Sequence, residues 1–217
     1  MITAFSRILI EVPDLQAAES EYQCLLGAIP AGRLSLRNVE IVLQEDASLS
    51  APAISGLALL ADGNTPAMEE QRGLHLPIDL ERHVAGTSDC TATGLCAVDH
   101  IVLMTGDAAD CIRLFGENGY GMRLALDQMV PKWGGRMLFF RCGKMTLEVI
   151  HNIEEPPEQD LFWGITYLCE DLDFTLEQLD RRGVEHSDIR KGRKPDTRVA
   201  TINSHNLGLP TLLIEPA

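Results

Sequence analysis

Two side chains that can bind a metal ion stand out, each within a short stretch rich in apolar residues. His100 lies within residues 97–104, and Glu148 lies within residues 144–151. Both stretches have the apolar and β-branched content of a strand. Imidazole nitrogen together with carboxylate oxygen suits a divalent ion such as Zn, Fe, Mn, Ni or Co. If the two strands are adjacent, the pair predicts a site that polarises a carbonyl group or holds an enediolate or a catecholate.

Other roles are open for the same pair. A histidine on a strand is often satisfied by a backbone carbonyl group, and a glutamate on a strand often faces solvent. His100 and Glu148 also suit a metal-free general acid and base, or hydrogen bonds to a ligand. Two protein ligands are fewer than the usual catalytic set, and a third would come from His151, His205 or another subunit.

A second group of side chains suits an anionic substrate. Basic residues cluster between positions 190 and 198 in a chain of formal net charge -14, in a loop expected to lead into a strand. Guanidinium and ammonium groups there could bind a carboxylate or a phosphate, although a solvated loop neutralised by nearby acidic residues is the alternative. The substrate-binding candidates are Arg136, Arg141, Trp133, Trp163, Lys194, Arg198 and His205.

The composition sets the class of protein. The chain is 45% hydrophobic and 23% charged, as in ordinary globular proteins. Its apolar runs are far shorter than the roughly 20 residues of a membrane helix, and its start lacks a secretory h-region, so we expect a cytosolic protein. The negative charge disfavours nucleic acid and acidic membranes as partners.

The cysteines are scattered along the chain and form no C-x-x-C pair. We expect all of them to be reduced thiols, mostly buried in the core. These six residues are Cys24, Cys90, Cys96, Cys111, Cys142 and Cys169.

The expected elements recur in a fixed order, which predicts a repeat of about fifty residues. A strand, a helix and further strands are expected over residues 6–44 and again over 98–150 and 164–214, with an eroded copy over 56–80. The segment 84–94 is small, polar and rich in Gly, Thr and Ser, which is typical of a domain boundary. We therefore predict an N-terminal domain of residues 1–95 and a C-terminal domain of residues 96–217.

The first strand of three copies carries a sequence resemblance. The segments RILIEVPD (7–14), HIVLMTGD (100–107) and GITYLCED (164–171) resemble the βαβββ modules of the vicinal oxygen chelate superfamily. That superfamily includes glyoxalase I, fosfomycin and bleomycin resistance proteins, methylmalonyl-CoA epimerase and extradiol dioxygenases. The resemblance covers nearly the whole chain, and it implies an α+β fold in which modules pair into half-open β-bowls with helices on the outside. Residues 191–199 and 208–214 also resemble a glyoxalase-like subgroup.

The resemblance also implies where metal ligands lie, namely on the first and last strands of modules. The first-strand positions are Arg7, Ser55, His100 and Gly164, and the last-strand positions are Glu40, Glu148 and Leu212. Only the third module has both ligand types. The implied function is a divalent-metal-dependent lyase, isomerase or dioxygenase acting on a small anionic oxygenated metabolite. The alternative is a non-catalytic protein that sequesters a small molecule, and a homodimer is expected in either case.

Overall fold

The computed structural model describes residues 1–63, 71–80 and 89–216, except the side chain of Trp133. In this part of the chain, thirteen strands form one mixed sheet that carries three α-helices. The N-terminal half contains β1 Ile2–Val12, α1 Leu15–Leu26, β2 Arg33–Ser35, β3 Glu40–Glu45, β4 Ala53–Ala61 and β5 Ile78–Asp79. The C-terminal half contains β6 Leu95–Met104, α2 Ala108–Phe115, β7 Arg123–Val130, β8 Gly135–Cys142, β9 Met145–Asn152, β10 Leu161–Cys169, α3 Leu172–Asp180, β11 Arg190–Lys191, β12 Arg198–Ile202 and β13 Thr211–Glu215.

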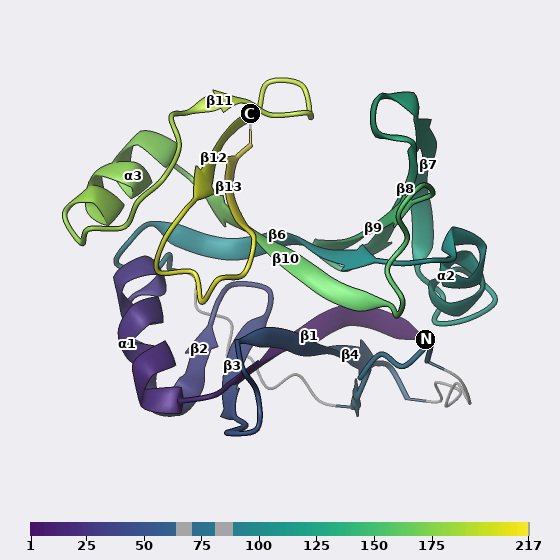
Figure 1. Ribbon diagram of the computed structural model, residues 1–217, viewed down its shortest axis with the longest axis horizontal. Helices are drawn as coiled ribbons and strands as arrows, with labels where there is room; N and C mark the ends of the chain where they lie inside the picture. Colours follow the sequence, from purple (N-terminus) through teal and green to yellow (C-terminus); the bar gives the residue numbers. More distant parts are fainter. Residues whose placement is uncertain (64–70, 81–88, 217) are drawn as a thin grey trace.

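The C-terminal half curves into a bowl (Figure 1). Strands β6 and β10 run antiparallel across its floor, and each pairs in parallel with the last strand of its own module, β9 or β13. Strands β8 and β7 rise on one side and β12 and β11 on the other, with α2 and α3 on the outside. The prediction of an α+β fold is confirmed.

The N-terminal half repeats part of this arrangement below the floor of the bowl (Figure 1). Strand β1 pairs in parallel with β3 and antiparallel with β4, and β4 contacts β10 through the pair Ile54 and Phe162. The sheet is therefore continuous between the two halves. Residues 64–70 of the eroded copy and residues 84–88 of the predicted boundary segment lie outside the described residues, and the division into two domains stays a prediction.

Three aspartates explain why each helix starts just after the first strand of its module. Asp14, Asp107 and Asp171 each adopt an extended backbone, and each side chain accepts a hydrogen bond from the backbone N–H three residues later. An aspartate in this position satisfies an N–H group that the first helical turn leaves without a partner. The helices then pack their apolar faces on the convex side of the sheet, where one buried core runs through both halves.

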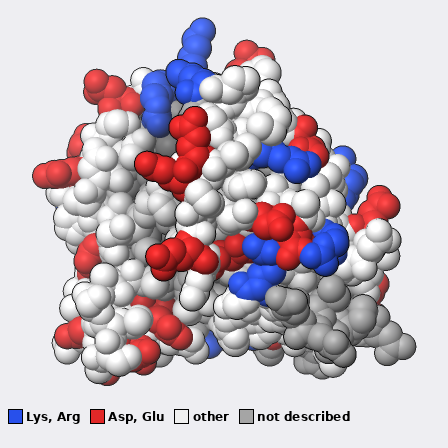
Figure 2. Space-filling model, turned by 45° about the vertical axis from the view of Figure 1, so that its right-hand side comes forward, with Lys and Arg blue, Asp and Glu red and all other residues white. Residues whose placement is uncertain are grey.

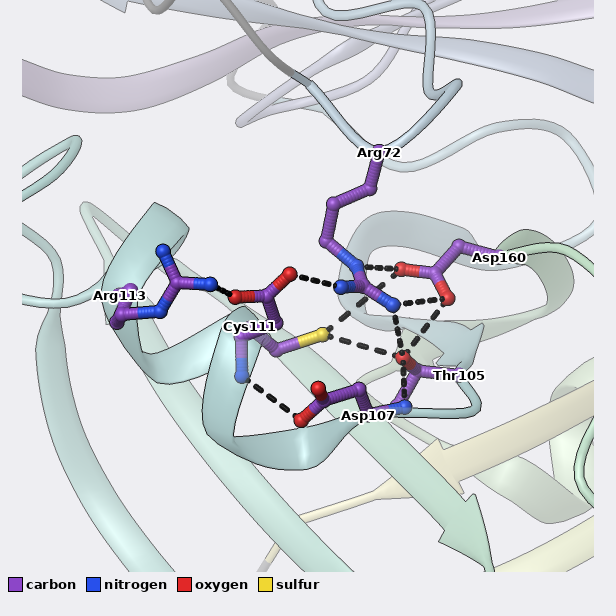
Figure 3. A network of polar contacts seen from close by, with 7 residues as sticks. Arg72, Thr105, Asp107, Cys111, Arg113 and Asp160 are labelled. Atoms are coloured by element: carbon purple, nitrogen blue, oxygen red, sulfur yellow. Dashed lines mark hydrogen bonds and ion pairs between the residues drawn. The ribbon is translucent and has the colours of Figure 1, made fainter.

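A buried polar network joins the two halves at one edge (Figure 3). The Arg72 guanidinium forms a two-pronged ion pair with Asp160, which precedes β10, and a further ion pair with Asp110 on α2. Thr105 at the end of β6 donates to the Asp160 carboxylate at 2.8 Å. The Asp160 side chain is only 2% exposed, so this network ties residue 72 to the bowl by buried charges.

The prediction for the cysteines is wrong at one place. Cys90 and Cys96 form a disulfide, and the other four cysteines are free thiols. Burial raises the pKa of the Cys111 and Cys169 thiols to about 11 and that of Cys142 to about 12, as expected of thiols in an apolar core. The two bonded residues stand only six positions apart, where a turn leads into β6. No helix in the described residues is long and apolar enough to cross a membrane.

Candidate metal and ligand site

The concave face of the bowl carries a row of residues that lie opposite one another on six strands. Residues directly opposite in a sheet point to the same face, and their neighbours along each strand point to the other. Those neighbours, including Ile101, Leu147, Ile165 and Leu213, lie in the core. The row therefore faces the inside of the bowl, and we call it the central row. It consists of Arg141, Thr146, His100, Thr166, Leu212 and Thr201.

His100 lies in the middle of the central row and meets Glu148 there. Glu148 is two residues after Thr146 on β9, so it faces the bowl as well. The His100 Nε2 atom lies 3.3 Å from a Glu148 carboxylate oxygen and 2.8 Å from the Thr166 hydroxyl oxygen. The His100 and Glu148 side chains are 14% and 12% exposed. The structure thus brings together the two candidate ligands that the sequence singled out.

Asp99 holds the other side of the His100 ring. Its carboxylate lies 2.7 Å from His100 Nδ1 and accepts a hydrogen bond from the Lys194 ammonium at 2.8 Å. Burial raises the pKa of Asp99, but the hydrogen bonds from His100 and Lys194 outweigh it, so this pKa lies well below its ordinary value of 3.8. Lys194 belongs to the loop between β11 and β12, which therefore closes over this side of the site.

His100 and Glu148 fit a divalent ion in donor type and in spacing. With the ring proton on Nδ1, the Nε2 lone pair and a carboxylate oxygen face each other at 3.3 Å. Two such atoms are about this far apart when both bind one ion through bonds of about 2.1 Å. A hydrogen bond from the other ring nitrogen to a carboxylate is the usual support of a metal-bound histidine.

Few side chains at this site can bind a metal ion. Gly164 and Leu212 stand at the ligand positions of the facing module, and a Cβ at Gly164 would meet the Pro210 carbonyl oxygen at 2.7 Å. Position 164 therefore has no room for a side chain that could bind a metal ion. In the described residues, the one group of three potential ligands is Cys90, Cys96 and Glu170, two of which are disulfide-bonded. An ion at His100 would thus keep positions open for the oxygens of a substrate or water.

Two threonines of the site could not be singled out from the sequence. Thr166 is placed opposite His100 by the register of β10 on β6, which no local sequence pattern specifies. Thr146 is 4% exposed, and its hydroxyl has no hydrogen-bond partner in the described part of the chain. A buried polar atom of this kind needs a partner, which a ligand or a water molecule could supply.

The basic residues predicted to bind substrate differ in whether a carboxylate of the protein already engages them. The Arg136 guanidinium forms a two-pronged ion pair with Asp127. The Arg198 guanidinium is held by Glu215 and Asp173, and these hydrogen bonds raise the pKa of Arg198. Both cations are thus engaged by carboxylates. Figure 2 shows basic side chains gathered at the top of one face with acidic ones close beneath them.

Arg141 and Arg193 lie at the bowl without a carboxylate partner among the described residues. Arg141 is the exposed end of the central row. Arg193, in the loop before β12, reaches the Met137 sulfur on β8 at 3.8 Å. An anionic group bound in the bowl could therefore meet a cation on either wall.

The remaining candidates lie in different places. Trp163 is 47% exposed, at an irregularity in the pairing of β10 with β6. His205 hydrogen-bonds with Ser204 in the loop between β12 and β13, whose Leu207 N–H donates to Glu21 on α1. Figure 1 shows this loop beside α1, at the end of β12 and β13 opposite the mouth of the bowl. His205 is thus not brought to the metal-site pair.

Comparisons with known proteins agree with this fold. The family model described as Glyoxalase/Bleomycin resistance protein/Dioxygenase superfamily matches residues 97–203, which include both halves of the bowl floor. No curated protein matches the chain.

Solved structures show the same fold. Methylmalonyl-CoA epimerase from Mycobacterium tuberculosis is 17% identical, with a TM-score of 0.50 over 60% of this chain and 94% of that one. A variant of Streptomyces coelicolor methylmalonyl-CoA epimerase in complex with 2-nitronate-propionyl-CoA is 16% identical, with a TM-score of 0.47 over 57% of this chain and 99% of that one. Residues 97–203 thus have the sequence pattern of the glyoxalase/bleomycin resistance protein/dioxygenase superfamily, and the solved structures share the fold.

Proposed function

We propose that the protein binds a divalent metal ion through His100 and Glu148 and catalyses an isomerase-type or lyase-type reaction on a small anionic metabolite with neighbouring oxygen atoms. The observation that carries this proposal is the 3.3 Å approach of His100 Nε2 to the Glu148 carboxylate, with Nδ1 held by Asp99. A cation bound between these two atoms would offset the repulsion between their lone pairs. Superfamily members typically bind a divalent metal, and a metal ion is such a cation.

The surroundings of the pair support a reaction at a carbonyl carbon. A bound ion would polarise a carbonyl oxygen and stabilise the negative charge of an enolate-like species. The chain itself supplies the Thr166 hydroxyl beside Nε2 and an apolar wall from Val102 and Leu212. Arg141 and Arg193 could hold a carboxylate or phosphate group of the substrate. The similarity to methylmalonyl-CoA epimerase from Mycobacterium tuberculosis favours an isomerase-type reaction over oxygen chemistry.

The enzymatic proposal is tested with metal-loaded protein and a panel of small carboxylates that carry an adjacent carbonyl or hydroxyl group. Deuterium uptake from D₂O at the carbon beside the carbonyl is measured by NMR, with product formation followed in parallel. We expect exchange that requires the metal and is lost in His100→Ala and Glu148→Gln. Metal-independent exchange that survives in both variants contradicts the proposal.

A ligand-sequestering protein is the second candidate, and the facing module favours it. Gly164 and Leu212 offer no imidazole or carboxylate at the ligand positions of that module, which suits a binding protein more than an enzyme with a complete set of metal ligands. Tight binding of a compound in the bowl, with neither exchange nor turnover in any metal form, would select this candidate. A general acid and base pair without metal is the remaining candidate, and it predicts exchange that is unaffected by chelators.

The proposal also covers the partner, the cellular location and the oligomeric state. We expect a small molecule as the partner, a cytosolic location, and a homodimer that could supply a further ligand to the open metal positions. Sedimentation analysis of the metal-free and metal-loaded protein tests the oligomeric state.

A further inference from the structure

Asp99 lies where a regular strand would not place it. Side chains alternate between the two faces of a strand, so Asp99 and His100 should point in opposite directions. On β10, however, Thr166 pairs with His100 and Tyr167 pairs with Val98, which leaves Asp99 without a partner there. This extra residue is a β-bulge, and it brings the Asp99 and His100 side chains to the same side.

The N-terminal half holds the backbone of the bulge. The Asn38 side chain accepts a hydrogen bond from the Val98 N–H at 3.0 Å and donates one to the Val98 carbonyl oxygen at 2.7 Å. Asn38 is 8% exposed, so both bonds are buried. The residue before the bulge is therefore fixed by a side chain sixty positions away, and the direction of Asp99 is fixed with it.

Two carboxylates compete for the proton of a neutral His100 ring. Asp99 lies 2.7 Å from Nδ1, whereas Glu148 lies 3.3 Å from Nε2. The shorter contact is the stronger hydrogen bond, so it draws the proton to Nδ1. The Thr166 hydroxyl, 2.8 Å from Nε2, can then donate to the lone pair.

We propose that Asp99 is a positioning residue that keeps the His100 proton on Nδ1 and so leaves the Nε2 lone pair for a metal ion. The tautomer itself follows from the contacts of Asp99, and its use in metal binding rests on the proposed function. Without Asp99, the Nε2 proton would be stabilised by Glu148. The ring would then present an N–H group to the position of the ion.

Four variants separate the acceptor at Nδ1, its charge, its cationic partner and the carboxylate at Nε2. Asp99→Ala removes the acceptor at Nδ1. Asp99→Asn keeps an acceptor oxygen without the charge, and Lys194→Met keeps Asp99 but removes its cationic partner. As a further control, Glu148→Ala removes the competing carboxylate at Nε2. The histidine tautomer is read from nitrogen-15 chemical shifts and long-range proton couplings of His100 in metal-free protein, at a pH where the ring is neutral.

We expect the Nδ1–H tautomer in the wild type, in Lys194→Met and in Glu148→Ala, and the Nε2–H tautomer in Asp99→Ala. Asp99→Asn should lie between them. Cobalt affinity measured by calorimetry should fall about 10-fold to 100-fold in Asp99→Ala and less in Asp99→Asn. An Nε2–H tautomer in the wild type, or an unchanged Nδ1–H tautomer in Asp99→Ala, overturns the positioning role.

The two readouts keep this inference apart from the proposed function. If the tautomer shifts as expected but the wild type binds no cobalt, Asp99 positions His100 and the metal proposal fails. If the wild type binds cobalt and Asp99→Ala binds it equally well, the metal proposal stands and the positioning role fails. Circular dichroism of each variant identifies any variant that is unfolded, and Asp99→Asn then carries the test, because it keeps the size and the acceptor.

Discussion

The first and third modules both carry ionisable residues on their first and last strands and use them differently. In the first module, the Arg7 guanidinium is paired with Asp79, and the Glu40 carboxylate is paired in two-pronged fashion with Arg33. In the third module, His100 takes the position of Arg7, but the residue opposite it is Thr146, and Glu148 lies two residues further along the last strand. His100 and Glu148 face each other. One pair of positions is thus closed by ion pairs, and the other holds two groups that can share a cation.

The two modules therefore share the arrangement of their strands but differ in the contacts that their ionisable side chains make. Asn38 and Arg72, both from the N-terminal half, reach into the C-terminal half and hold β6 and the approach to β10. The N-terminal modules therefore act as a support for the bowl. If that view is correct, changes at these contacts should be felt in the C-terminal half.

The largest expected loss of stability follows from Asp160→Ala. The substitution leaves the Arg72 guanidinium, which is 17% exposed, without its two-pronged partner. Removing one member of a buried ion pair typically costs about 3 kcal/mol or more. Urea unfolding should show this loss, whereas Arg113→Ala at the exposed end of the same network should cost less than about 1 kcal/mol. Equal losses in both variants would mean that the network does not join the halves.

Asn38→Ala should have an intermediate effect. It leaves the Val98 N–H and carbonyl groups without their buried partner, at a cost of about 2 kcal/mol. Because the bulge loses its support, cobalt affinity should fall as well. The exposed Asn203→Ala is the matched control and should change the free energy of unfolding by less than about 0.5 kcal/mol. Loss of stability without any change in cobalt affinity would show that the N-terminal half does not shape the site.

The smallest effect is expected at Glu215, where Arg198 lowers the carboxyl pKa from its ordinary value of 4.5. A carboxyl whose folded pKa is lowered stabilises the protein fully above its unfolded pKa, and this contribution is lost as the pH falls through the folded pKa. Glu215→Gln should therefore cost under about 1 kcal/mol at pH 7, and less at pH 3. The exposed Glu185→Gln should show no such pH dependence. A difference that grows toward low pH contradicts the assignment.

The sequence predicted the parts of the site that depend on local patterns. Helix-capping aspartates and apolar strands located the modules, and the parallel pairing of the first and last strands brings His100 to Glu148. Asp99 was missed because strand alternation places it on the wrong face, and its bulge depends on β10 and Asn38. Thr166 was missed because strand register is a property of the folded sheet. The Cys90–Cys96 bond depends on a turn at the start of β6, which the spacing of the cysteines did not indicate.

Cobalt titration of three forms of the protein tests the central claim most directly. The two variants each change a glutamate on the last strand of one module, Glu148 on β9 of the third or Glu40 on β3 of the first. If the third module alone holds the metal site, the wild type and a folded Glu40→Gln bind cobalt in stoichiometric amount, and Glu148→Gln loses it. Absence of binding in the wild type, or binding that is lost in Glu40→Gln and kept in Glu148→Gln, would contradict the account.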